Sequence, residues 1–354
     1  YQRRVRGIPQ MKVLTANLEH FSCKDIIQEL EIAKDADIFC FQEIFWSGQI
    51  ENATEMTVVY NNKKYVCNLC FDSVQLLYES VCQQLGFPNG SMFTLSDQQN
   101  FVFYPSKRCF APRHYQKQLF LTQTEVQQQQ LAQLWLQPEN AFNPCIKELM
   151  KRLQTPYCFF SGTGNPAFGN LILSRFRFLQ ARTQLLVGQN KENPWHVRNA
   201  QLVLVDSKIP FQIVNLHLDH KSESERCIQL KQLLQTITPS SKTIICGDFN
   251  SLQQEDYLEQ QIQEQNQLRQ KNGLEECRFD VIKMMKTGYF DTLWFSPRSV
   301  VQGCVEQTTH YGTRVDYIFA SMDLFGSVVK QNVIELKNSD HNAVFLELHS
   351  GIVM

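Results

Sequence analysis

Residues 243–250 read TIICGDFN, an apolar run that passes through Gly247 and ends in polar side chains. Such a run is typical of a buried β-strand. Residues i and i+2 of a strand point to the same face, so Asp248 and Asn250 are expected to aim at one point while Phe249 packs the other way. The segment therefore predicts an interior strand that carries an acid and an amide at its end.

In a second segment, residues 339–348 (SDHNAVFLEL), the polar residues come first and the apolar run follows. Here Asp340 and His341 precede an apolar run that is typical of a strand. Acid, amide and imidazole groups gathered at strand ends are suited to hold a divalent cation and a phosphate group. For each segment taken alone, a simple turn built from these residue types remains the alternative.

The bulk composition describes a globular protein with enough chain for an extensive core. The chain has 354 residues, of which 43% are hydrophobic and 19% are charged. Length alone favours two domains, but β-sandwiches of up to about 250 residues form single domains, and we expect one domain over residues 11–350. The formal net charge of -1 provides no global positive field, so recruitment of nucleic acid or an anionic membrane would be local.

Cysteine usage favours a reducing compartment such as the cytoplasm, with a secreted effector as the alternative. Of the twelve Cys, Cys40 and Cys246 lie inside apolar runs, where a buried thiol acts as a small hydrophobe. Cys67 and Cys70 form a lone CxxC pair with no second pair at zinc spacing, which favours a structural role. The sequence contains no apolar run of 18 residues and predicts no transmembrane segment. It leaves the oligomeric state open and is compatible with a monomer.

Hydrophobic periodicity predicts strands interspersed with helices. Helices are expected at 26–36, at 74–85 and after Ser222, which fits a capping box with Glu225. The expected strands are 12–18, 37–43, 170–174, 201–205, 211–218, 243–248, 315–320 and 343–348, with 201–205 and 211–218 forming a hairpin. This pattern predicts an α/β fold, a four-layer α/β sandwich of two packed sheets flanked by helices.

Two stretches interrupt this rhythm and are expected to be insertions. Residues 88–156 contain four consecutive glutamines, and residues 253–273 are Gln-rich and polar on nearly all sides. The second stretch predicts an exposed helix that ends at Gly273. Neither has the composition of a separate domain with its own large core.

Several polar residues elsewhere in the chain also sit at or inside strand-like runs. Glu43 and Asn17 each end a strand, where a solvated terminus or a turn is the simpler interpretation of either residue alone. His217 shares a strand face with its polar neighbours at i−2 and i+2. Asp316 lies in an apolar run and requires a partner, for which a protonatable His and Arg314 are the alternatives.

Seven segments, taken together and in order, resemble the endonuclease/exonuclease/phosphatase superfamily, also called DNase I-like. They are LTANLEHF, DIFCFQEI, FGNLILSRF, VNLHLDH, IICGDFNS, RVDYIFAS and NSDHNAVF, and they span residues 12–348. The resemblance implies a DNase I-like four-layer sandwich with a phosphoester hydrolase site at one end. It also implies dependence on Mg²⁺, with Mn²⁺ as a possible substitute.

The resemblance assigns expected roles to individual residues. For the metal, Glu43 matches the principal ligand, and Asn17 and Asp340 match groups on or near it. Asp248 matches the acid that positions or deprotonates the attacking water, and His341 competes with it for the role of base.

Further roles carried over by the same motifs concern the substrate. Asn250 matches a phosphate and metal-site donor, and His217 matches a phosphate-contacting or leaving-group residue. Asp316 pairs with the catalytic His. Asn170 and Arg175 match a mostly structural string, although Arg175 is also a candidate substrate-binding residue.

The substrate class is only partly constrained by the sequence. The superfamily cleaves nucleic acids, nucleotide–protein links, phosphoinositides and sphingomyelin, and the string at 314–317 differs from that of the inositol 5-phosphatase branch. The interval between Asp97 and Glu125 lacks acids and interleaves cations with aromatics, which could bind a phosphate backbone or an anionic lipid surface, or form an ordinary solvated loop. We favour a phosphodiesterase acting on nucleic acid over one acting on a phospholipid headgroup; the third alternative is an inactive binding module.

Overall fold

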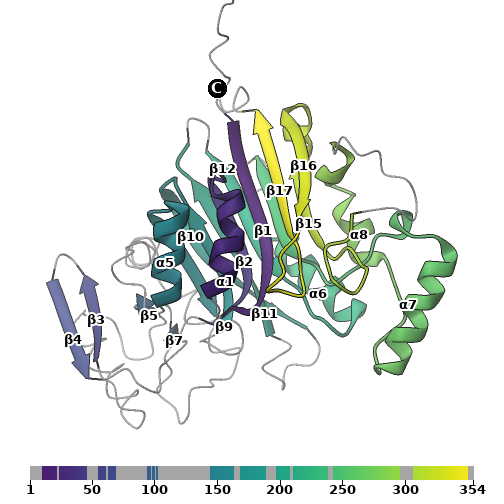
Figure 1. Cartoon of the computed structure of the whole chain (residues 1–354), viewed down its shortest axis with the longest axis horizontal. Helices are drawn as coiled ribbons and strands as arrows, with labels where there is room; N and C mark the ends of the chain where they lie inside the picture. The colour runs from purple at the N-terminus through teal and green to yellow at the C-terminus, as the bar shows by residue number, and fades with distance from the viewer. Residues whose placement is uncertain are drawn as a thin grey trace, which may run out of the picture.

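In the computed structural model, the described residues are 10–21, 24–45, 55–60, 63–68, 94–96, 98–99, 101–102, 144–162, 168–188, 197–207, 210–237, 242–295 and 306–349. Two six-stranded sheets form the body of the protein (Figure 1). The order of the first is β16 (Val328–Ile334), β17 (Ala343–His349), β1 (Gln10–Phe21), β2 (Ile38–Phe45), β9 (Phe168–Ser174), β8 (Tyr157–Gly162). The order of the second is β10 (Phe178–Val187), β11 (Val197–Val205), β12 (Phe211–His217), β13 (Thr243–Asp248), β15 (Asp316–Ser321), β14 (Tyr289–Asp291).

Each sheet contains one parallel pair, and these two pairs position the polar residues. The parallel pairs are β1 with β2 and β12 with β13, whereas the other strand pairs of the two sheets are antiparallel. The carboxyl ends of parallel neighbours lie at the same edge of a sheet. Polar residues that follow these strands are therefore brought to a common edge.

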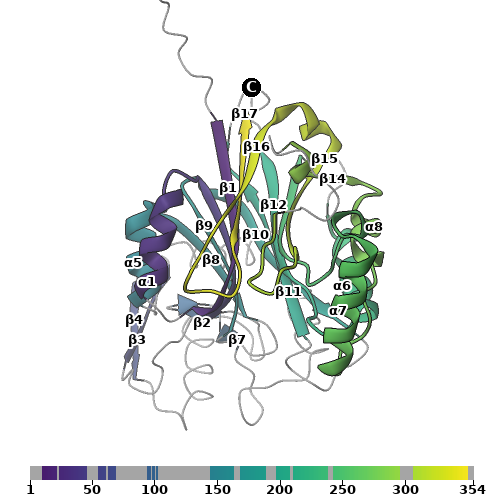
Figure 2. The same ribbon diagram turned by 45° about the vertical axis from the view of Figure 1, so that its right-hand side comes forward.

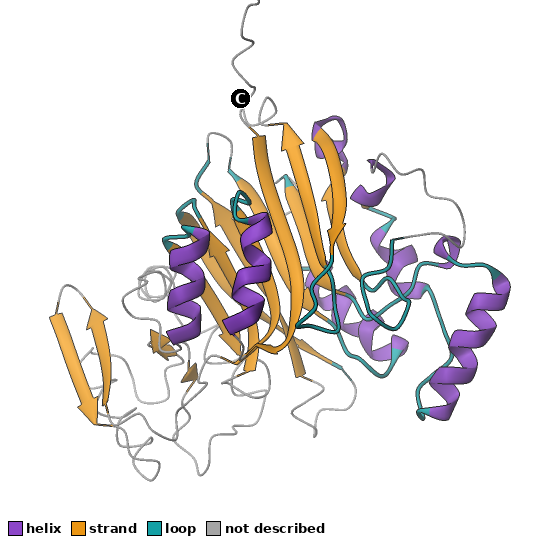
Figure 3. Ribbon diagram, viewed as in Figure 1, coloured by secondary structure: helices purple, strands orange, loops and turns teal. Residues whose placement is uncertain are grey.

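Helices cover the outer face of both sheets and complete four layers (Figure 2, Figure 3). The helices α1 (Lys24–Leu30) and α5 (Pro144–Leu153) lie on the first sheet, whereas α6 (Glu223–Leu234) and α8 (Asp280–Met285) lie on the second. Short 3-10 turns are η1 (Glu31–Ala33), η6 (Gln254–Asp256), η7 (Thr292–Phe295) and η8 (Met322–Ser327). Two small separate sheets comprise β3 (Glu55–Tyr60) with β4 (Lys63–Asn68), and β5 (Thr94–Ser96) with β6 (Gln98–Gln99) and β7 (Phe101–Val102).

Three apolar clusters separate these layers. Side chains such as Val13 and Ile244 fill the space between the sheets. Leu14, the next residue after Val13, instead packs toward α1 and α5, as the alternation of a strand requires. Leu230 of α6 belongs to the third cluster, between the second sheet and its helices. The predicted four-layer α/β sandwich is thereby confirmed.

Local features of the expected pattern are also present. The strands β11 and β12 form the predicted antiparallel hairpin, and Ser222 caps α6 by accepting a hydrogen bond from the Glu225 amide at 3.4 Å. The helix α7 (Glu259–Lys271) has no buried residue and is followed by Gly273, whose φ of 67° suits the end of a helix. The expected helix at 74–85 lies outside the described residues, as does most of the expected insertion at 88–156.

The end of that expected insertion belongs to the sandwich. The helix α5 packs against α1 in the first cluster, where Ile146, Leu149 and Leu153 are fully buried. Treating all of residues 88–156 as an insertion was therefore too broad at its C-terminal side. The strands β8, β10 and β16 were not expected individually. The single domain over residues 11–350 stays a prediction.

Candidate active site

Acids and amides from the two sheets meet at the carboxyl ends of the parallel strand pairs. The side-chain nitrogen Nδ2 of Asn17, on β1, lies 3.2 Å from Oε1 of Glu43 and 3.1 Å from Oδ2 of Asp248. Asn17 and Asp248 are 231 residues apart in the sequence and belong to different sheets. One amide therefore donates to two carboxylates and links the two halves of the sandwich.

The backbone is strained where these side chains emerge. Glu43 and Asn250 have φ angles of 59° and 51°, in the left-handed region that non-glycine residues seldom adopt. Gly247 has φ of 134°, and a Cβ atom there would lie 2.0 Å from the carbonyl oxygen of Leu216. Only glycine allows β13 to approach β12 this closely, which places Asp248 opposite His217 in the register.

His217 is buried and joins this group of acids. Its Nε2 atom lies 3.4 Å from Oδ2 of Asp248 and 3.9 Å from Oε1 of Glu43. Its Nδ1 atom faces the guanidinium of Arg198, with Nη1 at 3.4 Å. Arg198 comes from the neighbouring strand β11 and was not singled out in the sequence.

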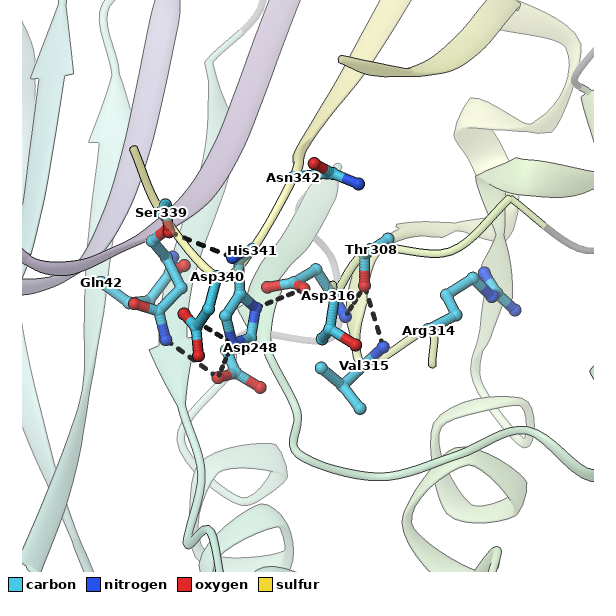
Figure 4. A network of polar contacts seen from close by, with 12 residues as sticks. Gln42, Asp248, Thr308, Arg314, Val315, Asp316, Ser339, Asp340, His341 and Asn342 are labelled. Atoms are coloured by element: carbon cyan, nitrogen blue, oxygen red, sulfur yellow. Dashed lines mark hydrogen bonds and ion pairs between the residues drawn. The ribbon is translucent and has the colours of Figure 1, made fainter. Parts of the chain in front are cut away.

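Asp316 pairs with His341 rather than with Arg314. The distance from His341 Nδ1 to Asp316 Oδ2 is 2.8 Å, and both side chains are buried (Figure 4). Arg314 instead binds Asp256 and Asp291, each at 2.7 Å. Of the two alternatives open from the sequence, the structure selects the histidine partner and excludes the pair with Arg314.

The second ring nitrogen of His341, Nε2, is directed at two further acids. Its Nε2 atom lies 3.9 Å from Oδ2 of Asp248 and 3.9 Å from Oδ1 of Asp340 (Figure 4). Burial lowers the pKa of His341, but the charge and hydrogen bond of Asp316 and the charges of Asp248 and Asp340 outweigh it and raise the pKa to about 10. These contacts favour the protonated form of the ring.

Asp248 is surrounded by groups with opposing effects. Burial raises its pKa, and the nearby Asp316 charge raises it further. His341 and the hydrogen bonds from Asn17 and Asn250 lower it, and the net pKa is about 7. Asp248 is thus an acid that exchanges a proton near neutrality in the absence of a bound cation, which is a property of groups that act as acids or bases.

Asn250 is placed beside Asp248 largely by its backbone. Its amide N–H donates to Asp248 Oδ1 at 2.8 Å, and its side-chain Nδ2 donates to the carbonyl of Leu218 at 3.2 Å. Phe249 packs the other way, as expected from the alternation, with its ring 5.5 Å from that of Tyr317. The side-chain oxygen of Asn250 is not engaged in either of these bonds.

Two hydroxyl residues to which the sequence assigned no role in the site hold the loops around His341. Ser339 donates to the carbonyl of Asn17 at 2.8 Å and accepts from the His341 amide at 3.1 Å. Thr308 accepts from the amides of Val315 and Asp316, at 3.0 and 3.1 Å (Figure 4). Neither residue stands out in the sequence because Ser and Thr are frequent in loops.

The structure does not bring Arg175 to this group. Arg175 follows β9, whose last residue Ser174 pairs with Ile38 at the start of β2, whereas Glu43 lies five residues further along β2. That offset is roughly 16 Å along a strand. Arg175 contacts the carbonyls of Lys34 and Leu153 and the carboxylate of Asp37. Its position fits a structural role and provides no support for substrate binding.

Asn170, from the same sequence string as Arg175, has structural contacts as well. Its Nδ2 atom lies 2.9 Å from Oδ1 of Asn199 and 3.1 Å from the carbonyl of the same residue. Because Asn170 is on β9 and Asn199 on β11, these bonds join the two sheets.

Two sets of residues come into question for a metal ion. Ligand atoms of Asp248, Asp316 and His341 lie within 4.8 Å of one another, but His341 and Asp316 already share a hydrogen bond of 2.8 Å, which a metal ion in this set would have to replace. Glu43 and Asp340 have side-chain exposures of 21% and 29%, so water can reach them. Carboxylates that water can reach are the kind of ligand that a hard divalent cation prefers.

No helix among the described residues has the length and apolarity to cross a membrane. This finding agrees with the absence of an apolar run of 18 residues in the sequence.

Comparisons with known proteins agree with the fold and with the sequence motifs. No curated protein matches the chain. Among solved structures, an endonuclease/exonuclease/phosphatase from Bacteroides vulgatus is similar with a TM-score of 0.52 and 14% identity, covering 96% of this chain and 98% of that chain. One from Beutenbergia cavernae is similar with a TM-score of 0.50 and 16% identity, covering 96% of this chain and 71% of that chain. At these identities the likeness concerns the fold.

The family assignment itself comes from the sequence match. The model of the Endonuclease/Exonuclease/phosphatase family matches residues 14–341, nearly the whole chain. The match includes the strands on which Asn17, Glu43, His217, Asp248 and Asp316 lie, and it reaches His341. The protein therefore belongs to the endonuclease/exonuclease/phosphatase family, whose members are hydrolases of phosphoric esters.

Proposed function

We propose that the chain is a divalent-cation-dependent phosphodiesterase and that nucleic acid is its substrate class. The observation that carries the proposal is the position of Asp248. Its Oδ2 atom lies within 4 Å of side-chain nitrogens from three other strands or loops, those of Asn17, His217 and His341. Burying a carboxylate together with an amide and two imidazoles at one point is costly for stability, and such clusters are typical of catalytic sites.

The cation is proposed to be Mg²⁺, held by Glu43 and Asp340 with Asn17 beside them. The donor set fits this ion, because Glu43 and Asp340 are carboxylates and Glu43 adopts a strained backbone conformation that directs its side chain to the group. When bound, Mg²⁺ offsets the charge that builds on phosphoryl oxygens. Asn17 uses its Nδ2 atom to donate to Glu43 and Asp248, and its Oδ1 atom accepts from the Glu19 amide at 3.1 Å. In this arrangement Asn17 orients ligands rather than contributing an oxygen.

Asp248 is proposed to orient the attacking water and accept its proton. It is the acceptor toward which Asn17, His217 and His341 all point a nitrogen atom. His341 is a poorer candidate for the base because the carboxylates around both of its nitrogens favour the protonated ring. This division of roles favours Asp248 over His341, which the sequence left open.

His341, His217 and Asn250 are proposed to contact the phosphate group. Asp316 stabilises the imidazolium of His341 and fixes the orientation of its ring, so the Nε2–H bond is directed at the acids and at any phosphate oxygen bound between them. His217 offers its Nε2 atom at the same place. Charge-assisted hydrogen bonds of this kind strengthen as negative charge develops on the phosphoryl oxygens.

The preference for nucleic acid over lipid is supported by sequence. The cations Lys107, Arg108, Arg113 and Lys117 alternate with Tyr104, Phe110 and Tyr115, and such a mixture suits a phosphate backbone with stacked bases. This interval lies outside the described residues. A phospholipid headgroup is the alternative substrate and becomes an outcome of the test below.

The test is a substrate panel with a matched control. Wild type, E43Q, H341A and D206N are incubated with Mg²⁺ and, separately, with DNA, RNA, sphingomyelin liposomes and phosphoinositide liposomes. Asp206 pairs with Arg177 at 2.9 Å in an exposed turn, so D206N controls for removal of a carboxylate elsewhere. We expect cleavage of DNA or RNA by wild type and D206N only.

The remaining outcomes of the panel contradict the proposal in different ways. Release of phosphocholine or inorganic phosphate from liposomes, with nucleic acid left intact, would select the lipid alternative. Undiminished cleavage by E43Q at saturating Mg²⁺ would exclude the proposed metal site. Failure of wild type to bind Mg²⁺ in calorimetry, together with no hydrolysis, would indicate an inactive binding module.

A further inference from the structure

Arg198 is a buried cation whose terminal nitrogens face two imidazole rings. It lies on β11 and is only 6% exposed. Its Nη1 atom is 3.4 Å from Nδ1 of His217, and its Nη2 atom is 3.0 Å from Nδ1 of His220. A buried guanidinium usually binds carboxylates directly, so this arrangement requires an explanation.

The guanidinium restricts the protonation of both rings. Arginine has only N–H donors and is not deprotonated in proteins. An imidazole nitrogen that faces it within hydrogen-bond distance must therefore be the acceptor, which carries no proton. In a neutral ring the proton then resides on the other nitrogen, Nε2.

The far side of His217 agrees with this assignment. Its Nε2 atom faces Oδ2 of Asp248 at 3.4 Å and Oε1 of Glu43 at 3.9 Å, and both are acceptors. An Nε2–H group satisfies these acceptors, whereas an unprotonated Nε2 would place a lone pair against two carboxylates. Contacts on both sides of the ring thus favour the same tautomer.

The charge of Arg198 is maintained by acids that surround it from several elements. Burial lowers the pKa of Arg198, and the charges of Glu43 on β2, Asp219 after β12 and Asp248 on β13 offset this only in part. Its Nε atom is buried and has no hydrogen-bond partner within the part of the chain that the structure describes. The two terminal nitrogens therefore make the hydrogen bonds of this guanidinium to His217 and His220, whereas Nε makes none among the described residues.

We propose that Arg198 is a positioning residue that locks His217 in the Nε2–H tautomer and fixes the direction of its ring, so that a neutral N–H donor points at the junction of Asp248 and Glu43. The same guanidinium holds exposed His220 in the same tautomer through its Nδ1 atom. The inference rests on the proposed function for its consequence in catalysis, but the lock itself is a property of the protein without substrate.

The tautomers of His217 and His220 can be measured directly by NMR of their ring nitrogens. Protein labelled with ¹⁵N in its eight histidines gives long-range ¹H–¹⁵N correlations that distinguish Nε2–H, Nδ1–H and doubly protonated rings. H217A and H220A assign the two spectra. We expect wild type and R177M to show Nε2–H rings at both positions, since Arg177 pairs with Asp206 in an exposed turn away from these rings. In R198M, His217 leaves the pure Nε2–H form.

A conservative variant protects the test against loss of folding. R198K retains the positive charge but has one terminal nitrogen instead of two. It is expected to keep the lock on at most one of the two rings. An unchanged His217 spectrum in folded R198M and R198K, or a wild-type ring in any form other than Nε2–H, would overturn the proposal.

The effect of Arg198 on catalysis is measured separately from the tautomers, by enzyme kinetics. With bis(p-nitrophenyl) phosphate and Mg²⁺, R198M is expected to lose on the order of 10- to 100-fold in kcat with KM changed less than about threefold, and R198K to recover part of the loss. If wild type hydrolyses no phosphodiester, the proposed function fails while the spectra still decide the lock. If wild type hydrolyses it and R198M shows equal kcat, the positioning role fails alone.

Discussion

The Nδ1 atom of His341 lies 2.8 Å from Oδ2 of Asp316 although Asp316 begins β15 of the second sheet and His341 lies just before β17 of the first. The other carboxylate oxygen of Asp316, Oδ1, is buried and has no hydrogen-bond partner among the described residues. Among the described side chains, the carboxylate of Asp316 therefore makes one hydrogen bond, the one to His341. This contact both joins the two sheets at the candidate site and determines the charge of the imidazole.

Asp316→Asn tests this relationship at nearly constant shape. The amide removes the negative charge that stabilises the imidazolium, so protonated His341 becomes less populated and its ring orientation less defined. We expect kcat on a phosphodiester with Mg²⁺ to fall by about 10²- to 10⁴-fold. Circular dichroism verifies the fold, and D206N serves as the control. Retention of more than half of the wild-type activity in folded D316N would rule out this role.

Asp248 is expected to destabilise the metal-free protein as pH rises. Its pKa is about 7 in the folded state, chiefly because of burial, against an ordinary value of 3.8. The folded state thus binds a proton more tightly than the unfolded state, and stability decreases between these two pH values as the acid ionises. Above pH 7 the full cost is present, and below pH 4 it is absent.

Asp248→Asn should therefore stabilise the protein at high pH. In EDTA at pH 8, we expect the free energy of unfolding to rise by about 1–3 kcal/mol, a gain that shrinks as pH is lowered toward 4. Urea denaturation at several pH values measures the difference, and D206N is the control. A gain that is equal at pH 8 and pH 4 would show that it does not arise from ionisation of Asp248.

Strand ends were the part of the site most accessible to sequence reasoning. Asp248 and Asn250 were expected on one side of Phe249 because alternation along a strand is local, and Phe249 is indeed buried on the opposite side. The need of Asp316 for a partner was also a local conclusion, from an acid in an apolar run. The identity of that partner is nonlocal, since it depends on which segments of the two sheets lie side by side.

Residues that act through hydrogen bonds across sheets were beyond sequence reasoning. Arg198 resembles any charged residue at the start of an exposed strand until β12 is laid beside it. Thr308 resembles any loop hydroxyl until its two backbone donors are seen. Arg175 follows a family-like string that was expected to be mostly structural, and it lies at the end of β9 away from Glu43.

Thr308→Val is predicted to loosen the segment that carries Asp316. The hydroxyl accepts from two buried amides, of Val315 and Asp316, and valine has the same shape without the oxygen. Leaving these donors unsatisfied should cost about 1–3 kcal/mol in the free energy of unfolding. Activity should fall as well, because Asp316 then orients His341 less firmly. Urea denaturation and the phosphodiester assay measure the two effects.

The control for this change is Thr308→Ser, which retains the hydroxyl and removes a methyl group. We expect T308S to keep most of the activity that T308V loses. If both variants lose activity equally, the methyl contact and not the hydrogen bonds would be responsible.

Arg314→Met should be among the most destabilising substitutions in the described part of the chain. The guanidinium is 1% exposed, binds Asp256 and Asp291 at 2.7 Å each, and lies 4.2 Å from the centroid of the Tyr317 ring. Its removal leaves two buried acids without a counter-charge. Loss of one partner from a buried ion pair typically costs about 3–5 kcal/mol, and we expect a loss of at least this size.

Two comparisons separate the buried network from a general effect of removing arginine. R278M removes an exposed guanidinium that pairs with Asp280 at 2.6 Å, and it should change the free energy of unfolding by no more than about 0.5 kcal/mol. R314K retains the charge but cannot bridge both acids, so its loss should be intermediate. Equal urea midpoints for R314M and R278M would mean that the three buried charges contribute little to the fold. The ordered loss R278M, R314K, R314M is the result that the network requires.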